Sequence, residues 1–128
     1  MAEGSASVSG EGLDVLLVDG ALRPAKGGAT FETLNPATEE VLGVAADGSA
    51  EDMDGAIAAA RAAFDEGSWS SDPALRAHCL RQLRDALQAH GDELRALTTA
   101  EVGAPAFLTS GPQFDVPVAD LSFAADLA

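Results

Sequence analysis

The chain has 128 residues, enough for one compact domain, and it carries 21 acidic against 7 basic side chains, a formal net charge of −14. This charge repels phosphate backbones and anionic lipid surfaces, so nucleic-acid and membrane-surface partners are excluded. The single cysteine, Cys79, rules out an internal disulfide framework and fits a reducing compartment, which predicts a cytoplasmic protein. No run of the sequence approaches the roughly 18 apolar residues of a membrane span.

The first segment is small and polar, with too few apolar side chains to anchor it to a core. We predict a flexible tail over residues 1–12 and a folded part over residues 13–128. Within the folded part we place the strands at about residues 15–46 and the helices at about residues 50–128.

Two features predict the strands. Residues 15–18 are rich in β-prone side chains, and Asp19-Gly20 supplies the positive φ angles of a tight turn, so we expect a β-hairpin that returns through residues 21–23. A second extended run ends at Asn35-Pro36, because proline restricts the preceding residue and donates no amide. Residues 41–46 then resume as a strand.

A first helix is predicted to follow Ser49 and to end near Asp65. Ser49 can cap the helix, and Asp52 three residues later completes a capping box. Its apolar residues fall at helical spacing, which predicts a surface helix that covers a core. This stripe consists of Met53, Ile57, Ala60 and Phe64.

Three further helical segments are expected. Asp72 and Pro73 begin a helix whose stripe is Leu80, Leu83 and Leu87. His90-Gly91 is predicted to end it, with the glycine in a left-handed cap. A third helix occupies about residues 92–102, and a last amphipathic segment runs over residues 116–127 after a short helical turn.

No residue of the chain is assigned a catalytic, cofactor-binding or metal-binding role. Cys79 shares the stripe of Leu80 and Leu83, where a free cysteine behaves as a small buried hydrophobe. Adjacent helix residues point about 100° apart, so His78 and Cys79 form a poor dyad. His90 has no second ligand at zinc spacing, and capping explains it better. The acidic clusters lie at turns and helix starts, where they are solvated or favour the helix dipole.

The glycines do not form a phosphate loop. Neither Gly27-Gly28 nor the glycines of residues 4–12 match a dinucleotide or Walker pattern, and neither group leads from a strand into a helix. We interpret them as turn and linker glycines.

Three stretches occur in one fixed order. They are FETLNPATEEVLGVAADGSAEDMDGAIAAARAAF from Phe31 to Phe64, GSWS from Gly67 to Ser70, and EVGAP from Glu101 to Pro105. Together they resemble the N-terminal portion of the aldehyde dehydrogenase family. The likeness extends over nearly everything from about Val15 onward. No single stretch would be persuasive, but several unrelated elements in the right order are specific.

The resemblance implies an α/β fold: the N-terminal β-hairpin and helices of a Rossmann-like cofactor domain, which is incomplete here. A complete enzyme of this family would oxidise an aldehyde substrate to a carboxylic acid with NAD or NADP, through a cysteine thiohemiacetal, and would be a homo-oligomer. The family's nucleophile in a Gly-Gln-x-Cys loop, its general-base glutamate and its glycine loop lie downstream of the matching part. The chain alone is therefore expected to be inactive and to bind no cofactor.

Two details qualify the likeness. Some members hold a structural monovalent cation near the residues that match Thr33 and Glu101. Many relatives carry lysine where this chain has Ala104, which suggests a subfamily.

One alternative is a non-catalytic interaction or assembly module on the same scaffold, which would melt cooperatively and bind little hydrophobic dye. A third idea, an acidic hydrolase, has no motif behind it.

Overall fold

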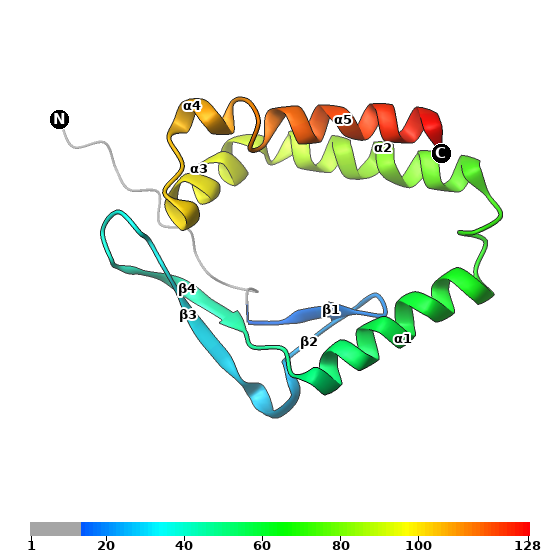
Figure 1. Ribbon diagram of the computed structural model, residues 1–128, viewed down its shortest axis with the longest axis horizontal. Helices are drawn as coiled ribbons and strands as arrows, with labels where there is room; N and C mark the ends of the chain where they lie inside the picture. Colours follow the sequence, from blue (N-terminus) through cyan, green and yellow to red (C-terminus); the bar gives the residue numbers. More distant parts are fainter. Residues whose placement is uncertain (1–13) are drawn as a thin grey trace.

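The structure is a computed structural model that describes residues 14–128; the tail predicted for residues 1–12 lies outside the described residues. Short strands come first and helices follow, so the predicted α/β class is confirmed (Figure 1). The elements are β1 (Leu16–Val18), β2 (Ala21–Arg23), the 3-10 helix η1 (Lys26–Gly28), β3 (Thr30–Leu34), β4 (Val41–Ala46), α1 (Ala50–Glu66), α2 (Pro73–Ala89), α3 (Gly91–Val102), α4 (Ala106–Thr109) and α5 (Asp115–Leu127).

Strands β1 and β2 form the predicted hairpin. Asp19 and Gly20 both have positive φ, at 54° and 72°, which matches the twist of the two antiparallel strands. Leu17 lies opposite Leu22 in the register. Between β2 and β3 the predicted turn is a single turn of 3-10 helix, in which Gly27 and Gly28 have positive φ.

Strands β3 and β4 form a second antiparallel pair, joined by the loop that begins at Asn35-Pro36. The Asn35 side chain accepts a hydrogen bond from the amide of Ala37 at 2.9 Å, and the Asn35 carbonyl accepts one from the amide of Glu39 at 2.7 Å. These bonds hold the chain in a tight turn where β3 ends, as the sequence predicted. Among residues 14–128 both sheets are antiparallel and two-stranded.

Helix α1 begins as predicted. The Ser49 side chain accepts a hydrogen bond from the amide of Asp52 at 3.2 Å, and the Asp52 carboxylate accepts one from the amide of Ser49 at 2.9 Å. This reciprocal pair satisfies two amides that the helix itself leaves without partners. The helix ends one residue beyond the predicted Asp65.

Helix α2 also begins as predicted, but its end differs. The Asp72 carboxylate accepts a hydrogen bond from the amide of Leu75 at 2.9 Å, and Pro73 occupies the first turn. The left-handed cap predicted at Gly91 is wrong, because Gly91 is the first residue of α3. The chain bends at His90 alone, whose carbonyl accepts a hydrogen bond from the amide of Leu94. The left-handed glycine is instead Gly103, at the end of α3.

Helix α5 runs back along α2 (Figure 1). Val118 and Ala125 of α5 are buried, and two arginines of α2 reach across to α5. Arg84 donates to the Ser122 hydroxyl at 2.9 Å, and Arg81 pairs with Asp126 at 2.9 Å. Arg95 of α3 forms ion pairs with Asp92 at 2.7 Å and with Asp115 at 2.6 Å. The pair with Asp115 connects α3 to the start of α5.

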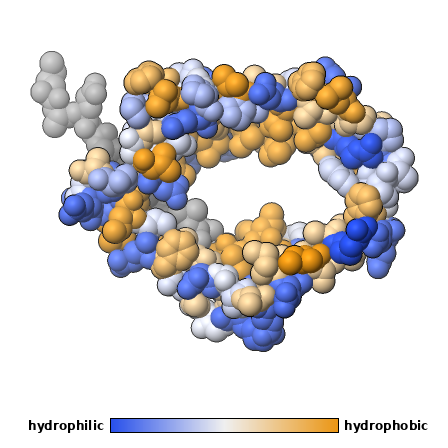
Figure 2. Space-filling view, in the orientation of Figure 1, coloured by the Kyte–Doolittle hydropathy of each residue, from blue (hydrophilic) through white to orange (hydrophobic). Residues whose placement is uncertain are grey.

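The described elements form two groups around an opening, with β1 to β4 and α1 on one side and α2 to α5 on the other (Figure 1). The extensive contacts join β1, β2 and α1, or β3 and β4, or the helices α2 to α5, and they do not join α1 to α2 (Figure 1). The space-filling view shows that side chains do not close the opening (Figure 2). The groups approach where a Cβ added to Gly103 would lie 3.0 Å from Cγ of Pro36.

Consequently, the described residues bury little apolar surface. The buried apolar side chains are Val18, Ala25, Ala77, Ala104, Val118 and Ala125. The predicted stripe of α1 does not cover a core, because Met53 is 61 % exposed, Ile57 60 % and Phe64 47 %. Leu83 of the α2 stripe is exposed as well. Among the described helices, none combines the length and the hydropathy that a membrane crossing requires.

Candidate functional site

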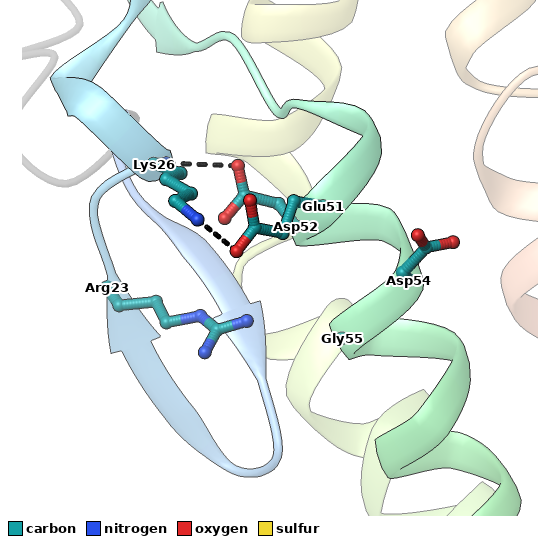
Figure 3. Close-up of a pocket in the computed structure, with 6 residues that line it drawn as sticks. All are labelled: Arg23, Lys26, Glu51, Asp52, Asp54 and Gly55. Carbon is teal, nitrogen blue, oxygen red and sulfur yellow. Dashed lines mark hydrogen bonds and ion pairs between the residues drawn. The ribbon is translucent and has the colours of Figure 1, made fainter.

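The most connected polar cluster surrounds the first turn of α1 and is centred on Asp52 (Figure 3). One carboxylate oxygen of Asp52, Oδ2, accepts three hydrogen bonds: from the amide of Lys26 at 3.0 Å, from the amide of Ser49 at 2.9 Å and from the Ser49 hydroxyl at 2.7 Å. The Asp52 side chain therefore caps its own helix and also holds η1, which lies 26 positions earlier in the chain.

Electrostatics favour the charged form of this carboxylate. The pKa of Asp52 lies below the ordinary value of 3.8, chiefly because of the hydrogen bond from the Lys26 amide and then because of the two bonds from Ser49. Burial opposes this shift, and the nearby charge of Arg23 reinforces it. Beside it the Lys26 ammonium forms an ion pair with Glu51. Asp52 is thus held as a structural anion.

A shallow cavity of about 590 Å³ opens beside this cluster. Arg23, Lys26 and Gly55 line it together with three acidic residues, Glu51, Asp52 and Asp54 (Figure 3). Three carboxylates would repel the pyrophosphate of a dinucleotide, and both basic groups already face these acids. The residues of this cavity do not fit NAD or NADP.

The sequence assigned no catalytic or metal-binding role to the cysteine or to the two histidines of the chain. Cys79 is half-buried on α2, His78 beside it is exposed, and His90 is exposed between α2 and α3. Nδ1 of His90 lies 3.4 Å from Oε2 of Glu93. The predicted cap by His90 is made by its backbone, whose amide donates to the Ala86 carbonyl at 3.2 Å. Within residues 14–128 no three His, Cys, Asp or Glu side chains are grouped as metal ligands would be.

The two positions considered for a monovalent cation lie in different groups of elements. The Thr33 hydroxyl on β3 donates to the carbonyl of Gly43 at 3.3 Å. Glu101 is exposed near the end of α3. Ala104, where the resemblance led us to note a missing lysine, is 5 % exposed. A methyl group fills this position, where the long charged side chain of lysine would have to reach solvent.

The link between Lys26 and Asp52 was missed from the sequence. The spacing of Ser49 and Asp52 predicts the capping box, and nothing local indicates that the same carboxylate also binds an amide in a distant turn. The only local signal was the turn predicted at Lys26-Gly27-Gly28.

Comparison with known proteins identifies the scaffold. The sequence model described as "Aldehyde dehydrogenase family" matches residues 23–128. The DhaS protein of Bacillus subtilis (strain 168) is 40 % identical over 110 residues, which cover 85 % of this chain and 22 % of that protein. The NADP/NAD-dependent aldehyde dehydrogenase PuuC of Escherichia coli (strain K12) is 41 % identical over 91 residues, which cover 70 % of this chain and 18 % of that protein.

Solved structures agree with the sequences. The G224D mutant of an aldehyde dehydrogenase from Bacillus cereus superposes with a TM-score of 0.83 at 34 % identity, covering 98 % of this chain and 26 % of that one. An NAD+ complex of aldehyde dehydrogenase from the same species gives 0.82 at 35 % identity, with coverages of 97 % and 26 %. The chain spans about a fifth of the length of the curated relatives it matches.

The order of hairpin, capped helix and antiparallel helix pair is therefore shared in backbone and in sequence. The fold is that of the N-terminal portion of those enzymes. This chain belongs to the aldehyde dehydrogenase family.

Proposed function

We propose that this chain is the N-terminal part of an NAD(P)-dependent aldehyde dehydrogenase that oxidises an aldehyde to a carboxylic acid. The observation that carries the proposal is the agreement between the family match over residues 23–128 and the backbone match to the Bacillus cereus enzyme. Related structures are described as complexes with NAD+, and one from Pseudomonas syringae also with octanal. These ligands support the reaction class.

In this proposal the chain supplies scaffold and no reacting group. Cys79 is half-buried on α2 beside the exposed His78, and Asp52 fastens η1 to α1. A nucleophile must be held against its substrate and its base before it reacts. The chain alone is therefore expected to be inactive and to bind neither NAD nor NADP.

The remaining properties follow from the family. The complete enzyme would take an aldehyde substrate, bind NAD or NADP through segments beyond this chain, form a homo-oligomer and work in the cytoplasm. Membership of the family supports the substrate, the cofactor and the assembly, and the single cysteine fits a reducing compartment such as the cytoplasm. The acidic surface supports the expectation that neither nucleic acid nor membrane is a partner.

A chimera tests the proposed function. This chain would replace the matched quarter of the Bacillus cereus aldehyde dehydrogenase, and NADH formation would be measured with a simple aliphatic aldehyde. The proposal expects an active chimera and no turnover by the isolated chain. A chimera that unfolds cooperatively on heating yet forms no NADH would contradict it.

Two controls separate the chain's own chemistry from that of the chimera. Turnover by the isolated chain that is lost on Cys79→Ala would overturn the proposal, because it would make Cys79 a nucleophile. Binding of NAD to the isolated chain in calorimetry would also overturn the proposal, because the chain would then have a cofactor site of its own. A sharp two-state melt of the isolated chain would favour the alternative of an interaction module.

A further inference from the structure

We propose that Asp19-Gly20, at the tip of the hairpin of β1 and β2, is a site of spontaneous modification at which the aspartate converts to isoaspartate. The conversion proceeds through a succinimide ring and needs only the chain and water. It does not depend on the reaction that the complete enzyme would carry out.

The chemistry conserves every atom. The backbone nitrogen of Gly20 attacks Cγ of the Asp19 carboxyl group, a C–N bond forms, and the hydroxyl of that group leaves with the amide proton as water. Water then opens the succinimide at one of its two carbonyls. Attack at Cγ restores aspartate, whereas attack at the main-chain carbonyl of Asp19 breaks the original peptide bond and leaves the chain running through Cγ. This second product is isoaspartate, which has the mass of aspartate, and neither step oxidises or reduces a group.

The chain contains three pairs with the same local chemistry: Asp19-Gly20, Asp47-Gly48 and Asp54-Gly55. Glycine after aspartate favours ring closure, because it has no Cβ to crowd the attacking nitrogen. The three pairs lie in a hairpin turn, in a loop and in a helix, respectively. The fold therefore decides which of them reacts.

The hairpin pair is exposed and little constrained. Asp19 has φ of 54° and Gly20 has φ of 72°, a left-handed conformation that suits aspartate less well than glycine. A Cβ built on Gly20 would meet nothing within 4 Å, so the ring has room to form. The flanking strands have three residues each, and a two-stranded hairpin of this kind is marginally stable. Local opening of the turn lets the Asp19 carboxyl group rotate toward the Gly20 nitrogen.

The pair in α1 is held by its helix. Gly55 lies inside α1, where an amide donates to the carbonyl four positions earlier. Attack by the Gly55 nitrogen on Asp54 would require the helix to unwind. A Cβ built on Gly55 would also lie 3.3 Å from Nη2 of Arg23, so this position is crowded.

The pair in the loop before α1 is held on both sides. The amide of Asp47 donates to the carbonyl of Ala29 at 2.9 Å. Beyond Gly48, the amide of Ser49 donates to the Asp52 carboxylate at 2.9 Å. Rotation of the peptide between Asp47 and Gly48 would strain both bonds. The hairpin turn is thus the pair whose backbone moves most freely.

Conversion would change the hairpin itself. Isoaspartate adds one methylene to the main chain, and a lengthened turn no longer matches the two-residue connection that suits the twist of the strands. Leu17 lies opposite Leu22 in the register, and Val18 beside the turn is buried. The modification would therefore weaken the pairing of β1 with β2.

The test measures the isoaspartate that accumulates when the purified chain is stored at neutral pH and body temperature for several weeks. A protein isoaspartyl methyltransferase with labelled S-adenosylmethionine counts the isoaspartyl carboxylates, and peptide mapping assigns them to the three pairs. Short synthetic peptides that span each pair give the rates without a fold. We expect Asp19-Gly20 to keep most of its peptide rate, and the other two pairs to react several-fold more slowly than their peptides.

Asp19→Glu is the matched variant, and Asp54→Glu is its control. Glutamate keeps the charge but would have to close a larger ring, which forms more slowly. We expect Asp19→Glu to remove most of the methyl acceptance of the stored chain and Asp54→Glu to leave it nearly unchanged. Equal isoaspartate fractions at the three pairs, a rate at Asp19-Gly20 suppressed as strongly as the others, or unchanged methyl acceptance in Asp19→Glu would overturn the proposal. Because NADH formation plays no part in this measurement, these outcomes leave the proposed function standing.

Discussion

The backbone amide of Lys26 donates a hydrogen bond of 3.0 Å to the carboxylate of Asp52, which joins the turn before β3 to the first turn of α1. The same oxygen accepts both bonds from Ser49, so one side chain fixes a helix start and the approach of a distant segment. This carboxylate therefore fastens the start of α1 to the turn before β3.

The first prediction concerns Asp52→Asn. The amide side chain keeps the shape but loses the charge, and charge-assisted hydrogen bonds are the stronger kind. We expect a lower urea midpoint than for the unchanged chain. Asp54→Asn is the control, because Asp54 is exposed two residues further along α1 and its substitution should leave the urea midpoint nearly unaltered. Equal effects of the two substitutions would refute the role given to Asp52.

The second prediction is the pH dependence of the same contact. The pKa of Asp52 is lowered in the folded chain, so its contribution to stability is present above the unfolded value of 3.8 and is lost as pH falls through the folded value. The charged groups of Arg23, Lys26, Glu51 and Asp54 face the same cavity.

Because many other carboxylates titrate in the same range, the difference between the unchanged chain and Asp52→Asn is the quantity to follow. We expect this difference in urea midpoint to be constant from neutral pH down to about pH 4 and to shrink below it. The amide resonance of Lys26, followed by NMR, should move over the same acid range. A difference that grows as the pH falls would contradict the assignment.

The third prediction concerns Gly103→Ala. Gly103 has φ of +67°, and an added Cβ would lie 3.0 Å from Cγ of Pro36. The control is Gly28→Ala, because Gly28 has φ of +70° and an added Cβ would meet nothing within 4 Å. Both variants should lose about 1 to 2 kcal/mol from the left-handed conformation, and Gly103→Ala should lose more in urea unfolding. Equal losses of unfolding free energy would show that the close approach to Pro36 adds no cost to the Gly103→Ala substitution.

The fourth prediction concerns the isolated chain. Few of its large apolar side chains are buried, so a hydrophobic dye should bind strongly and the thermal transition should be broad. Dye fluorescence and near-ultraviolet circular dichroism on one sample would measure both. In the chimera, dye binding should fall. Weak dye binding together with a sharp transition of the isolated chain would argue for the interaction module instead.

Local rules account for the parts of the fold that the sequence predicted correctly. Asp19-Gly20 favours the positive φ angles of a tight turn, Ser49 with Asp52 favours the start of a helix, and Pro73 suits the first turn of a helix. Each of these depends on residues within four positions of one another. The strands and helices were therefore placed to within a residue or two.

What the sequence did not reveal depends on contacts between distant segments. The helical period of Met53, Ile57 and Phe64 shows that they share a face, but it does not show what lies against that face. Gly91 was misread because a glycine after a helix suits either a left-handed cap or the start of the next helix. The sequence analysis assigned no catalytic or cofactor-binding residue because the family's motifs for them do not occur in the chain. This assignment stays a prediction.

The separation of contacts into two groups along the chain has a consequence for synthesis. The extensive contacts of the two hairpins and α1 stay within residues 16–66, and those of α2 to α5 stay within residues 73–127. A nascent chain could therefore complete the first group before the residues of the second leave the ribosome, since short-range contacts form fastest. Emergence from the ribosome would then set the order in which the two groups assemble.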